Sequence, residues 1–113
     1  MRLRVKGKNI EVTASIREYA ETKIGKLEKY LTGDPEVEVE LSEEKNPSNP
    51  QSQVAEATLR LKGVTLRARN QSDSMVRSIN EVADDLTRQV KRHRDKRRRR
   101  RESAKAGQQP EAA

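Results

Sequence analysis

The segment from Arg88 to Arg101 limits what this chain can fold into more than any other feature. Ten of its fourteen residues are Lys or Arg and only Asp95 opposes them, so the segment carries a formal charge of +9. It cannot be buried, because each cation would lose its hydration without gaining a paired anion. A packed core must therefore come from the near-neutral residues 1–87, which hold 14 basic and 15 acidic side chains.

The same charge indicates the kind of partner. A dense cationic block gains free energy when it releases the counterions of a polyanion, so we expect a nucleic acid. An anionic membrane surface is less suitable, because the block has no interleaved apolar residues to enter the lipid. A disordered tail that only aids solubility is the alternative that charge alone leaves open.

Composition excludes several classes of function. A chain of 113 residues with 31% hydrophobic content holds one small domain. It has no Cys, and its two aromatic residues are Tyr19 and Tyr30, so stacking platforms for single-stranded nucleic acid are scarce. No apolar run reaches the ~20 residues of a membrane span, and the N-terminus lacks a signal-peptide core. We expect a soluble, cytoplasmic protein that recognises phosphates and shape.

Hydropathy periods predict six elements. Apolar residues alternate with charged ones over residues 2–6, 36–41, 55–62 and 64–69, which predicts four strands, the last two joined by a turn at Gly63. Helical spacing predicts a first helix over residues 16–31, with a capping box from Ser15 and Glu18. A second helix begins after Ser72 or Asp73 and continues past Val90 until like-charge repulsion frays it near Arg97.

This β-α-β-β-β-α order predicts an α+β fold, a two-layer sandwich with a four-stranded sheet and two helices on one face. We expect residues 1–96 to form the domain and residues 97–113 to form an Arg-rich, largely disordered tail. The first two strands should be parallel. On the open face of the sheet, Glu36, Glu38 and Glu40 should pair with cations of the neighbouring strands.

Catalysis has little support in the sequence. His93 is the only histidine and lies within the cationic run. The adjacent carboxylates Asp84 and Asp85 project about 100° apart on a helix, so they do not converge on one site. The five glycines form no phosphate-binding pattern. We therefore expect a protein that is not an enzyme, with no metal, cofactor or small-molecule substrate.

Two groups of cations are the candidate binding residues. Placed side by side, the two helices would combine them into one basic ridge suited to RNA phosphates, although the lysines of the first helix have nearby glutamates as an ordinary alternative. The ridge consists of Lys23, Lys26 and Lys29 in the first helix and of Arg88, Lys91, Arg92, Arg94 and Lys96 in the second.

Several segments of the chain form a recognisable set, the most specific being Lys26-Leu27-Glu28-Lys29-Tyr30. The others are Gly7 to Thr13, Ile16 to Tyr19, Val54 to Ala57, Gly63, and Ser78 through Gln89. Over about residues 1–96 these segments resemble one known family, the ribosome hibernation promoting factors, which includes ribosome-associated inhibitor A and was formerly called the sigma-54 modulation proteins.

The resemblance implies a protein that binds the small ribosomal subunit in the decoding channel, over the mRNA and the A- and P-site tRNA positions. It would block translation and preserve idle ribosomes under stress or in stationary phase. The resemblance places the family's basic helix positions on Lys23, Lys26 and Lys29 and on Arg88, Lys91, Arg92 and Lys96. Two departures stand out: Val76 replaces a usual tyrosine, and Asp85 replaces a common basic residue.

Two other functions compete with hibernation. A general double-stranded RNA-binding module also places two helices on one face of a small sheet. A dimer formed through the open sheet face, with the basic block as a solubilising tail, is the third reading.

Overall fold

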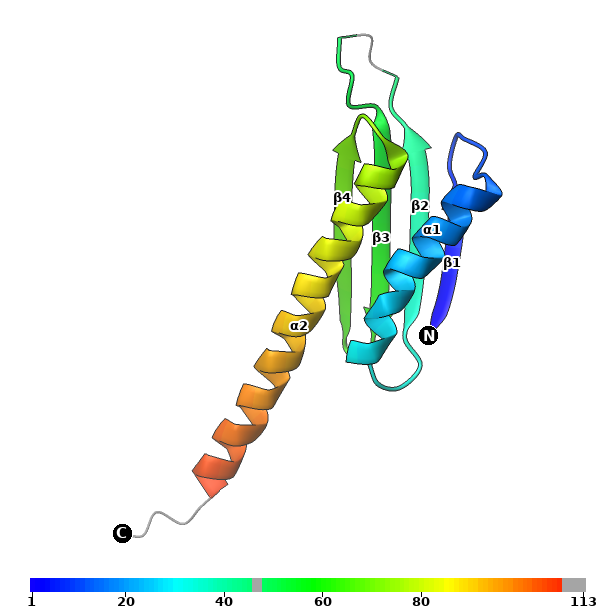
Figure 1. The fold of residues 1–113 in the computed structure, drawn as a ribbon. Coiled ribbons are helices and arrows are strands. Elements are labelled where there is room, and N and C mark those ends of the chain that lie inside the picture. Colours follow the sequence, from blue (N-terminus) through cyan, green and yellow to red (C-terminus); the bar gives the residue numbers. More distant parts are fainter. Residues whose placement is uncertain (46–47, 109–113) are drawn as a thin grey trace.

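The computed structural model describes residues 1–45 and 48–108, with side chains up to Arg99 (Figure 1). A four-stranded sheet with strand order β1-β2-β3-β4 carries both helices on one face, which confirms the predicted two-layer α+β sandwich. β1 and β2 are parallel, as predicted, and the other neighbouring strands are antiparallel. The elements are β1 (Arg2–Gly7), α1 (Ala14–Gly25), the 3₁₀ helix η1 (Lys26–Tyr30), β2 (Glu36–Glu43), β3 (Gln53–Leu61), β4 (Val64–Ser72) and α2 (Met75–Gln108).

The core lies between the sheet and the two helices. Alternation along β2 turns Val37, Val39 and Leu41 toward the helices, where each is at most 1% exposed. The apolar stripe of α2 meets them, and both Ile79 and Leu86 are completely buried. Since fully burying one such side chain contributes about 1.5–3 kcal/mol, this layer fixes where α2 lies on the sheet.

Ion pairs cover the open face of the sheet. The Lys6 ammonium lies 2.6 Å from one Glu38 oxygen and 3.5 Å from Glu40, while Arg60 lies 3.7 Å from the other Glu38 oxygen. Arg2 pairs with Glu36 at 2.8 Å. The expected cross-strand pairing is confirmed. The hydrogen bond between Lys6 and Glu38 and the charges of the two groups lower the pKa of the Glu38 carboxyl and raise the pKa of Lys6.

The first helix differs from its prediction at both ends. Thr13, not Ser15, is the N-cap, since its side-chain oxygen accepts a hydrogen bond from the Ile16 amide at 3.2 Å. Ser15 already lies inside the helix. After Gly25, a poor helix former, the chain tightens into η1 instead of continuing as an α-helix. With three residues per turn in η1, Lys26 and Lys29 project from the same side.

The last helix also differs. Ser74, rather than Ser72 or Asp73, directly precedes α2, and its hydroxyl accepts a hydrogen bond from the Arg77 amide at 3.4 Å. The predicted fraying near Arg97 is wrong, because α2 continues through Gln108. Arg is among the better helix formers, and a helix that has left the domain keeps each guanidinium hydrated. Beyond Val90, α2 extends by roughly 27 Å. The end of the expected tail, residues 109–113, lies outside the described residues.

Candidate nucleic-acid interface

The first helical segment, which consists of α1 and η1, lies beside α2 on the sheet, so the cations of both can reach one surface (Figure 1). Buried side chains hold them there: Ile24 and Leu27 from the first segment, and Leu86 and Val90 from α2, are each at most 2% exposed. The charged residues between these anchors must point away from the core. The geometry of the interface therefore follows from the packing of the two helices.

Three cations gather at one tyrosine. The Nζ atoms of Lys29 and Lys91 lie 5.0 and 5.2 Å from the centre of the Tyr30 ring, and the Arg94 guanidinium lies 5.5 Å from it. We call Tyr30, Lys29, Lys91 and Arg94 the Tyr30 cluster. Two helical segments supply it, as the ridge prediction requires. A hydrogen bond with Lys29, together with the charges of Lys29 and Lys91, lowers the pKa of the Tyr30 phenol.

Aromatic rings hold these cations without neutralising them. A cation over a ring face is attracted by the ring quadrupole, worth about 0.5–1 kcal/mol at an exposed site. Arg94 also lies beside a carboxylate, since its Nε atom is 3.8 Å from an Asp95 oxygen. Lys23 is likewise held over a ring, 5.7 Å from the centre of the Tyr19 ring. Lys26 is exposed on η1.

The remaining predicted residues of α2 form a stripe beside Lys91, because Arg88 and Lys91 are three residues apart and therefore neighbours on the helix surface. Arg88, Arg92 and Lys96 follow one another at intervals of four residues, so they form a second stripe, here called the outer stripe. Arg88 borders a hollow of about 470 Å³ together with Arg69 and Asn70 of β4. Arg88 thus lies toward β4, and Lys91 and Arg94 lie toward Tyr30. That all these cations form one RNA-binding ridge stays a prediction.

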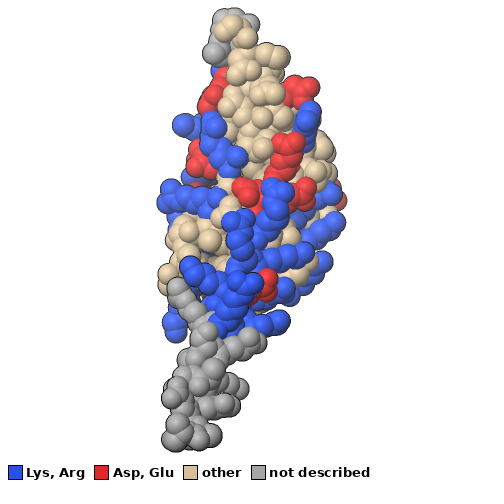
Figure 2. Space-filling model, turned by 90° about the vertical axis from the view of Figure 1, so that its left-hand side faces the viewer, with Lys and Arg blue, Asp and Glu red and all other residues tan. Residues whose placement is uncertain are grey.

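Part of the outer stripe is internally paired. The Arg88 guanidinium lies 4.0 Å from the Asp85 carboxylate. Figure 2 faces the α2 edge of the molecule and shows Lys and Arg gathered over its lower half, with the carboxylates mostly above them. Among the described side chains, the surface best suited to phosphate is therefore the part of α2 from Arg88 to Arg99.

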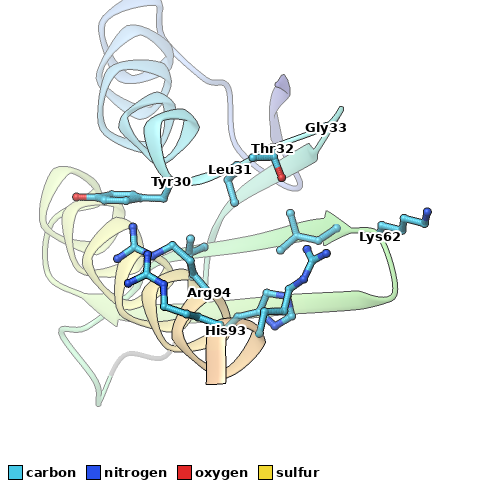
Figure 3. Close-up of a pocket in the computed structure, with 11 residues that line it drawn as sticks. Tyr30, Leu31, Thr32, Gly33, Lys62, His93 and Arg94 are labelled. Atoms are coloured by element: carbon cyan, nitrogen blue, oxygen red, sulfur yellow. The ribbon is translucent and has the colours of Figure 1, made fainter. Parts of the chain in front are cut away.

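Sequence reasoning missed a cavity beneath α2. Its volume is about 410 Å³, and it lies between the end of η1, the end of β3 and α2 (Figure 3). His93 of the cationic run borders this cavity and is only partly exposed. No local pattern could have revealed the site, because its walls come from three segments distant in sequence.

Other kinds of site find no support in the part of the chain that the structure describes. Within residues 1–45 and 48–108, no three His, Cys, Asp or Glu side chains are grouped closely enough to hold a metal ion. No helix in the same residues is both long enough and apolar enough to cross a bilayer. The interface is thus a cationic surface, with phosphate as the chemical group that it fits.

Comparison with known families identifies the family of this chain. Residues 3–98 match the model of the family described as sigma 54 modulation protein / S30EA ribosomal protein. The chain belongs to this family. The match includes every candidate binding residue of both helices and extends two residues past the predicted domain boundary at Lys96.

Curated relatives in the family are similarly close to this chain. A ribosome hibernation promoting factor of Salmonella typhimurium is 35% identical over 96 residues, covering 85% of this chain and 96% of that protein. A ribosome hibernation promotion factor of Lactococcus lactis is 39% identical over 94 residues, covering 83% of this chain and 50% of the relative. A Staphylococcus aureus protein of the same name is 37% identical, with 48% of it covered. The chain thus spans about half the length of two of these relatives.

Solved structures share the fold. The N-terminal domain of Thermus thermophilus Protein Y superposes with a TM-score of 0.72 and 30% identity, covering 82% of this chain and 99% of that domain. A Coxiella burnetii ribosomal subunit interface protein superposes with a TM-score of 0.70 at 17% identity, a likeness that bears on the fold alone.

Proposed function

We propose that this protein is a ribosome hibernation factor. It binds the RNA of the small ribosomal subunit in the decoding channel, overlaps the mRNA and the A- and P-site tRNA positions, and thereby blocks translation and preserves inactive ribosomes. Family membership and the names of its relatives support this role. The observation that carries it is the Tyr30 cluster, where cations from two helical segments present themselves together. A ribosomal partner places the protein in the cytoplasm.

The charge distribution suits folded RNA. Each phosphate contact is modest, but a protein that makes about six to ten of them loses roughly a thousandfold or more in affinity between low and moderate salt. The Tyr30 cluster, the outer stripe and the arginines that follow on α2 supply that many cations. With two tyrosines as its only aromatics, the protein recognises phosphates and shape rather than splayed bases along a strand.

Co-sedimentation with purified small subunits tests the proposal. The experiment uses two salt concentrations and an excess of long duplex RNA as competitor. A hibernation factor remains with the subunit in the presence of competitor and dissociates as salt rises. It also blocks mRNA-programmed tRNA binding to the same subunits, because the sites overlap.

The competing functions give different results in the same assay. A general double-stranded RNA-binding module transfers to the duplex competitor and leaves the subunit. A dimer with a solubilising tail shows tight self-association and no salt-sensitive sedimentation with RNA. Either result contradicts the proposal.

A further inference from the structure

The cavity beneath α2 has an apolar floor. Leu31 follows η1, Leu61 ends β3 and Val90 closes the apolar stripe of α2, and all three line it. Val90 is 2% exposed, whereas both leucines are only partly buried, so apolar surface remains open to an occupant. The volume of about 410 Å³ lies within the roughly 300–1,000 Å³ typical of pockets that hold small ligands.

The rim of the cavity is cationic. Arg94, Arg97 and Arg98 of α2 line one side, and Lys62 lies at the outer end of the hairpin. Among the residues that the structure describes, no carboxylate lines the cavity. Figure 3 shows Tyr30 and Leu31 on one side, with His93 and Arg94 facing them from α2. An apolar floor under an arginine rim complements a ligand with a flat apolar ring and an attached phosphate.

The cavity adjoins the proposed RNA surface. Tyr30 and Arg94 line the cavity and also belong to the Tyr30 cluster, where Lys29 and Lys91 present their charges. An RNA strand whose phosphates contact Lys29 and Lys91 therefore passes the mouth of the cavity. A free small molecule would gain nothing from this adjacency, whereas a nucleotide within the strand is held at the mouth by its neighbours.

We propose that the cavity receives one unpaired nucleotide of the bound RNA, a proposal that rests on the RNA-binding function proposed above. The base lies against Leu31 and Leu61, and its phosphate contacts Arg97 or Arg98. Such a pocket tolerates any base, because apolar contact and arginine stacking do not depend on hydrogen-bonding groups. It gives the protein a preference for RNA helices with an extruded nucleotide over perfect duplexes.

Thr32 offers a way to close the cavity. It is exposed in the loop after η1, and Figure 3 shows its hydroxyl directed toward the cavity. In a Thr32→Phe variant the ring occupies the mouth without altering the charge. The matched control is Thr65→Phe, because Thr65 is equally exposed but lies on the sheet face opposite the helices.

Binding is measured for two RNA hairpins that differ only in one unpaired nucleotide. The wild-type protein and Thr65→Phe should bind the bulged hairpin about tenfold more tightly than the paired one, the effect expected from one buried base. Thr32→Phe should bind both hairpins equally, with the affinity of the wild-type protein for the paired hairpin. Circular dichroism checks that the variants keep the fold.

The possible failures are distinguishable. Equal binding of both hairpins by the wild-type protein, or an undiminished preference in Thr32→Phe, overturns the cavity proposal. Adenosine monophosphate that competes as well as the bulged hairpin assigns the cavity to a free nucleotide and also overturns it. If the wild-type protein sediments with small subunits but shows no preference, only the cavity proposal fails. A preference without sedimentation removes the ribosomal role and leaves the cavity as an RNA site.

Discussion

The Nζ atom of Lys91 on α2 lies 5.2 Å from the centre of the Tyr30 ring at the end of η1. This contact joins the two helical segments at their charged surface, and in the core both segments contribute buried side chains, among them Leu27 and Val90. It follows from two features of the sequence: the apolar stripe of α2 ends at Val90, and the first helix tightens into η1 before Tyr30. The cationic surface is therefore set by packing.

The Tyr30 phenol should titrate below the ordinary range for tyrosine. The hydrogen bond with Lys29 and the nearby charges favour the phenolate and lower the pKa of Tyr30. In a Tyr19→Phe background, ultraviolet absorbance follows Tyr30 alone. Adding Lys29→Glu should move the midpoint upward, whereas Lys8→Glu should leave it in place. An unchanged midpoint in Lys29→Glu would mean that the cluster does not exist in solution.

Glu38 and Lys6 should give the fold a pH dependence with opposite signs at the two extremes. The pKa of Glu38 is depressed in the folded state, so its contribution is complete above the unfolded pKa and is lost as pH falls through the folded one. The pKa of Lys6 is raised, so its contribution is present below its ordinary 10.5 and is lost as pH rises through the folded value.

Urea midpoints measured from acid to neutral pH check the acid limb. Glu38→Gln should lower the midpoint at neutral pH and flatten its decline on acidification. Glu11→Gln, at an exposed position outside the sheet, should follow the wild-type curve. Parallel curves for wild type and Glu38→Gln would remove Glu38 as a source of the acid dependence.

Replacement of Gly7 and of Gly25 by alanine should change the stability of the protein in opposite directions. A Cβ at Gly7 would collide with the Ile10 carbonyl oxygen and press on Val12, so Gly7→Ala should destabilise the protein by more than about 1 kcal/mol. A Cβ at Gly25 meets nothing within 4 Å in a helical backbone, so Gly25→Ala should stabilise it by about 0.5–1 kcal/mol. Thermal and urea unfolding measure both changes. If Gly7→Ala stabilised the protein, that result would contradict the close approach of Gly7 in β1 to Ile10.

The outer stripe should contribute to affinity without deciding it. If RNA contacts both sides of α2, then Arg92→Ala with Lys96→Ala should reduce the slope of log K against log salt by about two, because each of the two side chains would otherwise neutralise one phosphate. Binding of small subunits at several salt concentrations gives the slope. An unaltered slope would confine the interface to the side toward Tyr30.

The periodic elements could be predicted from sequence because burial sets their pattern. Val37, Val39 and Leu41 alternate with glutamates, which fixes both the core face and the ion-paired face of β2. Terminal positions were harder to predict, since Thr13 and Ser15 are both good caps and only the entry of the chain from β1 selects Thr13. The length of α2 was underestimated because charge repulsion was weighed above the helix propensity of arginine.

The binding role of the candidate residues stays a prediction, but the structure gives part of their arrangement. Lys29 of the first helical segment meets Lys91 and Arg94 of α2 at Tyr30. The sequence alone did not show that Arg88 lies beside Arg69 and Asn70 of β4, because that depends on how α2 is rotated over the sheet. The cavity needs the approach of Leu31, Leu61 and Val90, which no local window of sequence contains.

Sedimentation of a double charge-reversal variant with small ribosomal subunits tests the central claim most directly. Lys29→Glu with Lys91→Glu reverses the Tyr30 cluster in both helical segments. Lys8→Glu with Arg67→Glu makes the same change in net charge at exposed positions outside it. We predict that the first pair reduces subunit binding by at least about a hundredfold at moderate salt and that the second stays within a few-fold of wild type. Equal binding by the two double variants would contradict the account, because the cluster would then contribute only through the net charge of the protein.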